Sequence, residues 1–331
     1  MPQRLTANEI GNLWTQNFQA GMSIRILLYF LETVEDEEVK ARIQQAYNIS
    51  IMIHEQTHLL LETNDIPLPI GFSERDVDLK APKLFSDPLM LNFIENMGKA
   101  GVLAHSLSLA SCSSQEIRSL FTAVLRGTTE LFNATVETAF SKGWFISPPQ
   151  IEIEKETELV RSKRYLSPIQ KRTLNTIEIT HLFENVKNNA LGELLCTGFA
   201  QTTQSKKIQQ FMLKGRNISN KHIRLFTKIF NEANLHPPMG SESFVTQSIT
   251  APFSDKLILA LISVLTSTGH GNYSTASSAS LRYDLVLLYQ KLSIEIGLFA
   301  KDGMDLMIKH NWLEEPPQLI NRSKIFNLRQ E

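Results

Sequence analysis

The stretch LFSDPLM at residues 84–90 has a counterpart, PFSDKLI, at residues 252–258, so that Phe-Ser-Asp precedes an apolar run twice, 168 positions apart. Serine and aspartate side chains accept hydrogen bonds from the free N–H groups of a first helical turn, and a proline suits that turn. The motif therefore predicts two helix starts, with Phe85 and Phe253 packed against the core. The predicted caps are Ser86 or Asp87 and Ser254 or Asp255.

Three further blocks recur in the same order along the chain. They are LTANEI (5–10) with LNTIEI (174–179), IPLPIG (66–71) with LHPPMG (235–240), and WFISPPQI (144–151) with WLEEPPQL (312–319). The offset changes by a single residue between 72 and 84, where a loop absorbs an insertion at little cost. Four ordered blocks indicate two homologous halves. We predict domains over 1–150 and 174–331, joined by a linker over 151–173.

Each half has the pattern of four helices. Apolar residues recur at spacings of three and four along 9–33, and the next helical stretch follows after almost no loop, which makes these two helices antiparallel neighbours. Two more helical stretches complete the half. In the second half the Ser/Thr-rich segment 267–280 is predicted to be a flexible loop between helices three and four.

The proline-rich segment 64–87 separates the two helix pairs of the first half. Proline resists helix formation, so we expect this segment to be extended, and extended chain at about 3.3 Å per residue spans a whole bundle. A helix pair, a long crossover and a second pair make the ferritin-like topology. The predicted fold class is all-α, with two tandem ferritin-like four-helix bundles and long crossover connections.

Composition narrows the function classes. Hydrophobic residues make up 42% and charged residues 20% of the 331, with a net charge of −1, which is typical of a soluble globular protein and does not favour nucleic acid as a partner. No apolar run reaches the roughly 18 residues of a membrane span, and no secretory signal pattern is visible. Cys112 and Cys196 lie at non-corresponding positions, which favours a reducing compartment, so we expect a cytoplasmic protein.

Several segments together carry a resemblance: IPLPIGF, APKLFSD, NNALGELLCTGFAQ, PFSDKL and DGMDLMIKHNWLEEPPQ. Over nearly its whole length the chain resembles an uncharacterised bacterial family of tandem four-helix proteins. That family occurs chiefly in spore-forming bacilli, and its members are sometimes labelled spore-coat-like by analogy with the coat F proteins. The resemblance implies the four-helix fold and a spore-forming bacterium as the host. The spore-coat-like label of the family implies a location in the forespore or the spore. It carries over no catalytic residue.

Ferritin-like carboxylate proteins hold two metal ions between Glu residues and Glu-x-x-His motifs on facing helices. Glu55 and His58 form one such motif, and His105 falls at about the same height if the crossover runs the full bundle length. Imidazole and carboxylate ligands suit iron or zinc. The second half retains His222, with His181, His270 and Asp284 as its possible companions. The remaining members of a di-iron set are missing in both halves.

A basic helix forms another candidate surface. Residues 194–231 contain no acid, and four lysines lie seven residues apart: Lys207, Lys214, Lys221 and Lys228. We interpret this stripe as a solvated helix face, with a surface for an acidic partner, nucleic acid or a spore polymer as the alternative.

No Ser/His/Asp or Cys/His arrangement supports a catalytic mechanism, although the sequence leaves enzymatic activity open. We therefore expect a non-catalytic structural or interaction protein, associated with sporulation or the spore coat, whose partners are further copies of itself or spore-layer components. The alternative is a metal-binding ferritin-like protein that holds iron or zinc in a bundle core.

Overall fold

The computed structural model describes residues 4–153, 156, 158–238 and 243–322, and within them eight α-helices form two four-helix units. The first unit consists of α1 (Ala7–Thr33), α2 (Glu37–Thr63), α3 (Asp87–Ser111) and α4 (Gln115–Ser141). The second consists of α5 (Thr176–Thr202), α6 (Lys206–Glu232), α7 (Asp255–Ala279) and α8 (Tyr283–Lys309). Corresponding helices start and end at the offsets that the sequence repeat gives, so the all-α fold with two tandem four-helix units is confirmed.

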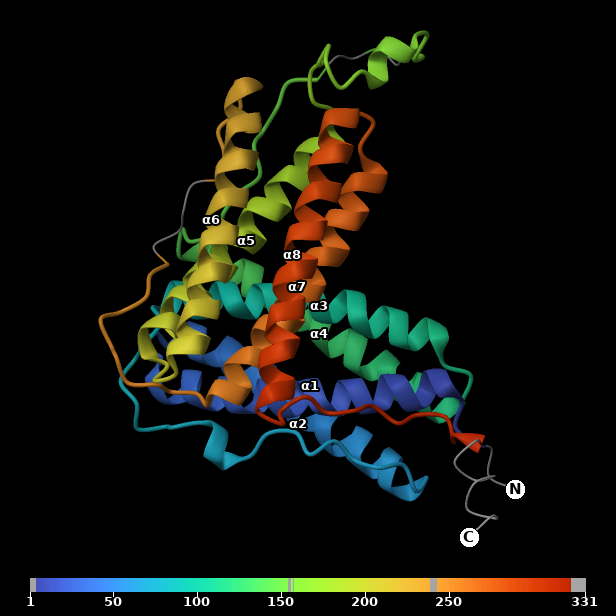
Figure 1. Ribbon diagram of the computed structural model, residues 1–331, viewed down its shortest axis with the longest axis vertical. Helices are drawn as coiled ribbons and strands as arrows, with labels where there is room; N and C mark the ends of the chain where they lie inside the picture. Colours follow the sequence, from blue (N-terminus) through green and yellow to red (C-terminus); the bar gives the residue numbers. More distant parts are fainter. Residues whose placement is uncertain (1–3, 154–155, 157, 239–242, 323–331) are drawn as a thin grey trace.

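The two units lie across each other. In Figure 1 helices α1–α4 run across the view and α5–α8 stand upright on them. A single apolar core continues from one unit into the other, since one cluster of buried side chains draws on both helix pairs of each unit. None of the described helices combines the length and the apolar character that a membrane-crossing segment requires.

The predicted domain bounds stay a prediction. The segment between the units includes a short 3₁₀ turn, η2 (Lys163–Leu166), and is exposed along most of its length. Parts of the predicted domains and linker lie outside the described residues, namely 1–3, 154–155, 157, 239–242 and 323–331.

Buried carboxylates tie the helix ends together in each unit. The Glu9 carboxylate accepts a hydrogen bond from the N–H of Thr6 at 2.8 Å, which is part of a capping box at the start of α1. It also accepts from the N–H groups of Ser113 and Ser114, at 3.0 and 2.7 Å, in the turn between α3 and α4. Burial by itself would raise the pKa of Glu9, but these hydrogen bonds outweigh it and lower the pKa to about 2. Glu178 makes the equivalent contacts in the second unit.

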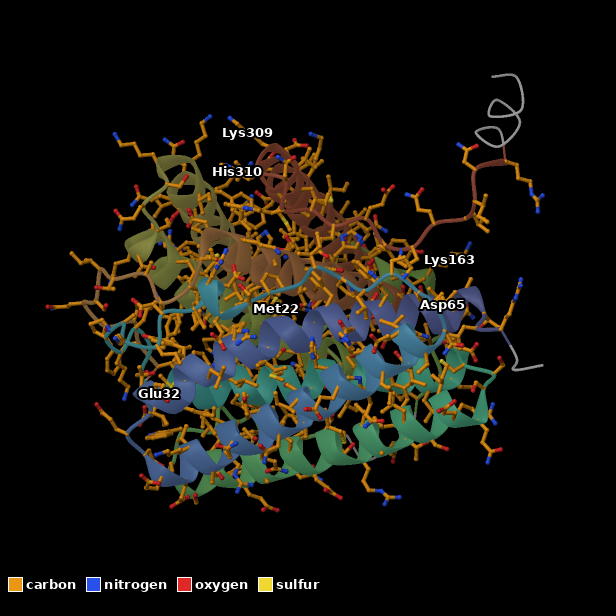
Figure 2. All side chains as sticks on the ribbon, turned by 90° about the horizontal axis from the view of Figure 1, so that it is seen from below. Met22, Glu32, Asp65, Lys163, Lys309 and His310 are labelled. Atoms are coloured by element: carbon orange, nitrogen blue, oxygen red, sulfur yellow. The ribbon has the colours of Figure 1, made fainter. Side chains whose placement is uncertain are left out.

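The crossover between α2 and α3 is largely extended, as predicted, with one 3₁₀ turn, η1 (Glu74–Asp76), and a further turn at Leu79 and Lys80. Figure 2 shows why it has to be long, because Glu32, near the end of α1, and Asp65, just after α2, lie at opposite ends of the unit. The crossover returns the chain to the end where α1 meets α2. There the Asp87 carboxylate accepts a hydrogen bond from the N–H of Asp36 at 2.8 Å.

The Phe-Ser-Asp motifs are helix starts, as predicted. Ser86 and Ser254 are the N-caps of α3 and α7. Their hydroxyl groups accept from backbone N–H groups three residues on, at 3.4 and 3.1 Å. Phe85 and Phe253 are 1% and 5% exposed, so both side chains enter the core.

The prediction of a flexible loop over 267–280 is wrong, because α7 continues to Ala279. Hydroxyl groups in this segment donate to carbonyl oxygens one turn earlier, as Thr275 does to Gly271 at 3.0 Å. Tyr273 and Ala276 are buried in the core of the second unit. This packing outweighs the weak helix propensity of glycine, serine and threonine.

Each crossover pairs with the Phe-Ser-Asp motif of the other unit. The N–H of Ser86 donates to the Phe244 carbonyl oxygen at 3.1 Å, and the Phe244 N–H donates to the Ser86 hydroxyl at 3.0 Å. The N–H and hydroxyl of Ser254 donate to the carbonyl and carboxylate oxygens of Asp76, at 2.9 and 2.7 Å. Since Asp76 and Phe244 are repeat equivalents, the arrangement is reciprocal. We call these two pairs the crossover lock.

An aromatic cluster lies beneath the crossover lock and joins the units. We call it the aromatic centre, and it consists of Tyr29, Phe30, Phe85, Phe199 and Phe253. Phe85 packs edge-on against Phe199 of the second unit, with 5.9 Å between ring centroids. Phe253 does the same against Tyr29 of the first unit, at 5.1 Å. Each motif thus places its phenylalanine against the first helix of the other unit.

Gly198 in α5 admits one of these rings. A Cβ atom added there would lie only 2.7 Å from Cε1 of Phe85, which is closer than side chains approach. The equivalent position in the first unit is Tyr29. The second unit therefore needs glycine at position 198, because any side chain there would collide with the Phe85 ring.

We predict that Gly198→Ala destabilises the protein by about 1–3 kcal/mol, because the overpacked Phe85 ring has to move. The measurement is the free energy of unfolding from urea denaturation. Gly11→Ala in α1 is the matched control, since nothing lies within 4 Å of its added Cβ. This control should gain stability, by up to about 1 kcal/mol, from helix propensity. Equal stabilisation by both changes would contradict the close packing of the Phe85 ring against Gly198.

Candidate functional site

The sequence-predicted metal residues of the first unit do not converge. Glu55 on α2 is exposed, whereas His58, one turn later, is partly buried, and its ring lies 6.1 Å from that of His54. His105 on α3 is buried, at 7% exposure. Among the described residues no group of three His, Cys, Asp or Glu side chains is arranged to hold a metal ion.

His222 on α6 lies in a closed hydrogen-bond network of the second unit. Its Nδ1 lies 2.8 Å from the Tyr273 hydroxyl, and its Nε2 lies 3.0 Å from the Glu295 carboxylate. The Asn189 amide donates to the same hydroxyl at 2.8 Å. A carboxylate only accepts, so Nε2 carries the proton and Nδ1 accepts from Tyr273.

This network has a structural character. Burial lowers the pKa of His222 although Glu295 acts in the opposite sense, so the ring is neutral at pH 7. Both ring nitrogens have partners, which leaves no lone pair for an ion. Two of the three companions expected from the sequence bond elsewhere, since His270 contacts Ser293 and Asp284 pairs with Arg282. His181, the third, is partly buried on α5.

The basic helix, α6, faces acidic residues of α8. Lys214 pairs with Asp302 at 2.5 Å, and Lys221 pairs with Glu295 at 2.7 Å. These ion pairs are half-exposed, so each contributes little to stability. They nevertheless neutralise the middle of the lysine stripe. The stripe is therefore a poorer surface for an acidic polymer than its sequence indicates.

The outer face of α8 carries an unusual set of exposed apolar side chains. Their exposures run from 44% to 67%. Their spacing places them on one side of the helix, broken by Lys301 and Asp305, which pair with each other at 2.7 Å. We call this surface the α8 stripe, and its members are Tyr283, Leu287, Ile294, Leu298, Met304 and Ile308.

The equivalent face of α4 is polar over its first four turns, whereas Val136 and the exposed Phe140 correspond to Met304 and Ile308 in its last turns. Ile294 and Leu298 correspond to Arg126 and Glu130, and Leu287 corresponds to Ser119. Two helices with the same place in the fold thus differ in what they present to their surroundings. This difference between α4 and α8 can be read from the sequence, because a position-by-position comparison of the two halves shows it. The search for motifs alone missed it.

A metal measurement tests the alternative function. Because Glu55 points into solvent and His222 is saturated by partners, we predict that protein purified from iron- and zinc-supplemented medium holds no stoichiometric metal. Elemental analysis by mass spectrometry is the measurement. His58→Ala and His105→Ala are the comparison variants. Stoichiometric iron or zinc that either change removes would contradict the prediction.

Comparison with known proteins places the chain in a family. A solved structure described as a "putative spore coat protein", from Bacillus halodurans C-125, is 20% identical, with a TM-score of 0.42, over 46% of this chain and 98% of that one. A similarity at this level does not establish a shared role. No curated protein matches the chain. The family model described as "Protein of unknown function (DUF3231)" matches twice, over residues 2–157 and 167–325. The chain therefore belongs to the DUF3231 family and contains two copies of its unit, which confirms the resemblance to an uncharacterised family.

Proposed function

We propose that this protein is a non-catalytic interaction protein that associates with a second copy of itself through the α8 stripe. The observation that carries the proposal is the contrast between α8 and α4. An exposed apolar helix face costs solubility, and contiguous apolar patches mark interaction surfaces in stable proteins. A duplicated unit that has polar side chains in one copy where the other has Leu287, Ile294 and Leu298 supports a specific role for α8.

The charges around the α8 stripe support a second copy as the partner. When two α8 helices pair antiparallel about Leu298, Lys291 of one copy lies opposite Asp305 of the other. The arrangement is self-complementary, as a two-fold interface requires. The opposite flank of α8 carries small residues, Ser293, Gly297 and Ala300, which let two helices approach closely. The interface between the two α8 helices would then have an apolar centre and a charged rim, as protein interfaces generally do.

The cellular setting is a further part of the proposal. The resemblance noted in the sequence implies a spore-forming bacterium, and the proposed role there is a component of the forespore or the spore layers. A self-associating all-α protein suits such a structural role.

The proposal predicts a dimer in solution that depends on Leu298. Leu298→Glu should weaken dimerisation at least about 30-fold, because a central interface residue contributes roughly 2 kcal/mol or more. Analytical ultracentrifugation over a concentration series measures this dissociation constant. The substitution should leave the fold intact, since Glu130 occupies the equivalent position of α4.

Ser119→Glu is the matched control, because it adds the same charge on the polar face of α4. This change should leave dimerisation unaltered. A wild-type protein that stays monomeric at high micromolar concentration would contradict the proposal. A dimer that tolerates Leu298→Glu would contradict the role of the α8 stripe.

A further inference from the structure

A cavity of about 210 Å³ lies inside the first unit, where α7 of the second unit packs against it. All four helices of the first unit line the cavity, and α7 adds Leu261, Val264 and Leu265. Met22, one of the lining residues, lies midway along α1 in Figure 2. The cavity is therefore at the middle of the bundle and touches both units.

The second unit largely fills the equivalent space, where a cavity of about 90 Å³ remains. The difference follows from side-chain size at repeat-equivalent lining positions. Where the first unit has small residues, the second has larger ones. The pairs are Ala20 with Asn189, Gly98 with Thr266, Ala104 with Asn272, and Thr128 with Ile296. The first unit thus keeps open a space that this fold is able to fill.

Two buried polar side chains line the larger cavity without partners. Gln16 and His105 are 6% and 7% exposed. The buried Nδ1 of His105 has no hydrogen-bond partner, and the Gln16 side chain makes no hydrogen bond with the described residues. Buried polar groups are nearly always hydrogen-bonded in proteins. The equivalent residues of the second unit do have partners, since Asn185 donates to a carbonyl oxygen and Tyr273 belongs to the His222 network. The two first-unit groups are therefore available to a bound molecule.

The other lining groups define the character of that molecule. The hydroxyl of Thr128 donates to the carbonyl oxygen of its own preceding turn, at 2.9 Å, and so does that of Ser50. Among the described residues that line the cavity there is no Asp, Glu, Lys or Arg. Burial also lowers the pKa of His105 to about 4, so the imidazole is neutral at pH 7. Nothing in the cavity would balance the charge of an ion.

We propose that this cavity is a binding site for a small, neutral, mostly apolar molecule with one N–H or O–H group, which hydrogen-bonds to Gln16 or His105. An apolar cavity of about 150 Å³ in another protein accommodates benzene. The larger cavity here matches a molecule of the size of indole. Because α7 lines one side, the bound molecule would contact both units. This inference is independent of the proposed self-association.

Indole is the probe, titrated into the full-length protein by isothermal calorimetry. Wild type should bind it, and Thr128→Ile should weaken binding at least tenfold by filling the cavity. The fold can accept that change, since the second unit holds Ile296 at this position, where even a Cβ atom added at Gly269, the equivalent of Gly101, would lie 3.7 Å from Cδ1 of Ile296. Thr129→Ile is the matched control on the exposed side of α4 and should bind as wild type does.

His105→Leu tests the hydrogen bond to the bound molecule separately from the filling of the cavity. This change should weaken indole binding at least fivefold while leaving benzene binding within twofold, whereas a general structural defect would weaken both. Circular dichroism checks that each variant is folded. Absence of indole binding to wild type up to its solubility limit would overturn the proposal. So would unchanged affinity in both Thr128→Ile and His105→Leu.

Discussion

Two serine side chains determine how this molecule is assembled. Ser86 and Ser254 each cap a helix of their own unit and also bond the crossover of the other unit, at Phe244 and Asp76. A helix N-cap contributes about 1 kcal/mol by itself. Here the same group also fixes the position of a long extended segment. The crossovers therefore act as connectors within a unit and as contacts between units.

The aromatic centre adds apolar contacts between the two units to the hydrogen bonds of the crossover lock. Phe85 and Phe253 follow from the same tripeptide motifs, and each packs against the first helix of the opposite unit. Fully burying a phenylalanine contributes roughly 1.5–3 kcal/mol. Because polar and apolar contacts come from adjacent residues, separating the units would break both at once. This explains why Phe-Ser-Asp is present in both halves.

The sequence predicted the helices well because repeat and periodicity are local properties. Its failure at 267–280 arose because small residues have weak helix propensity, and only the burial of Tyr273 and Ala276 keeps that segment helical. The crossover lock could not be predicted, since it pairs residues roughly 160–180 positions apart in sequence. Metal ligation was predicted from spacing alone and stays a prediction, and the exposure of Glu55 depends on which face of α2 packs into the bundle, which local spacing does not define.

The differences between the two units are easier to predict from the sequence than the contacts between them. Comparing the halves residue by residue gives both the apolar face of α8 and the small side chains around the first-unit cavity. Neither feature forms a motif, and each emerges only when the other half serves as reference. In a duplicated protein, departures from the repeat thus mark positions where the two copies have separate roles.

Calorimetric unfolding tests most directly whether the crossover lock and the aromatic centre make the two units one cooperative structure. We predict a single heat-capacity peak, with equal calorimetric and van't Hoff enthalpies, that Ser254→Ala shifts to lower temperature. Two separable peaks in the wild-type protein, one for each four-helix unit, would contradict it.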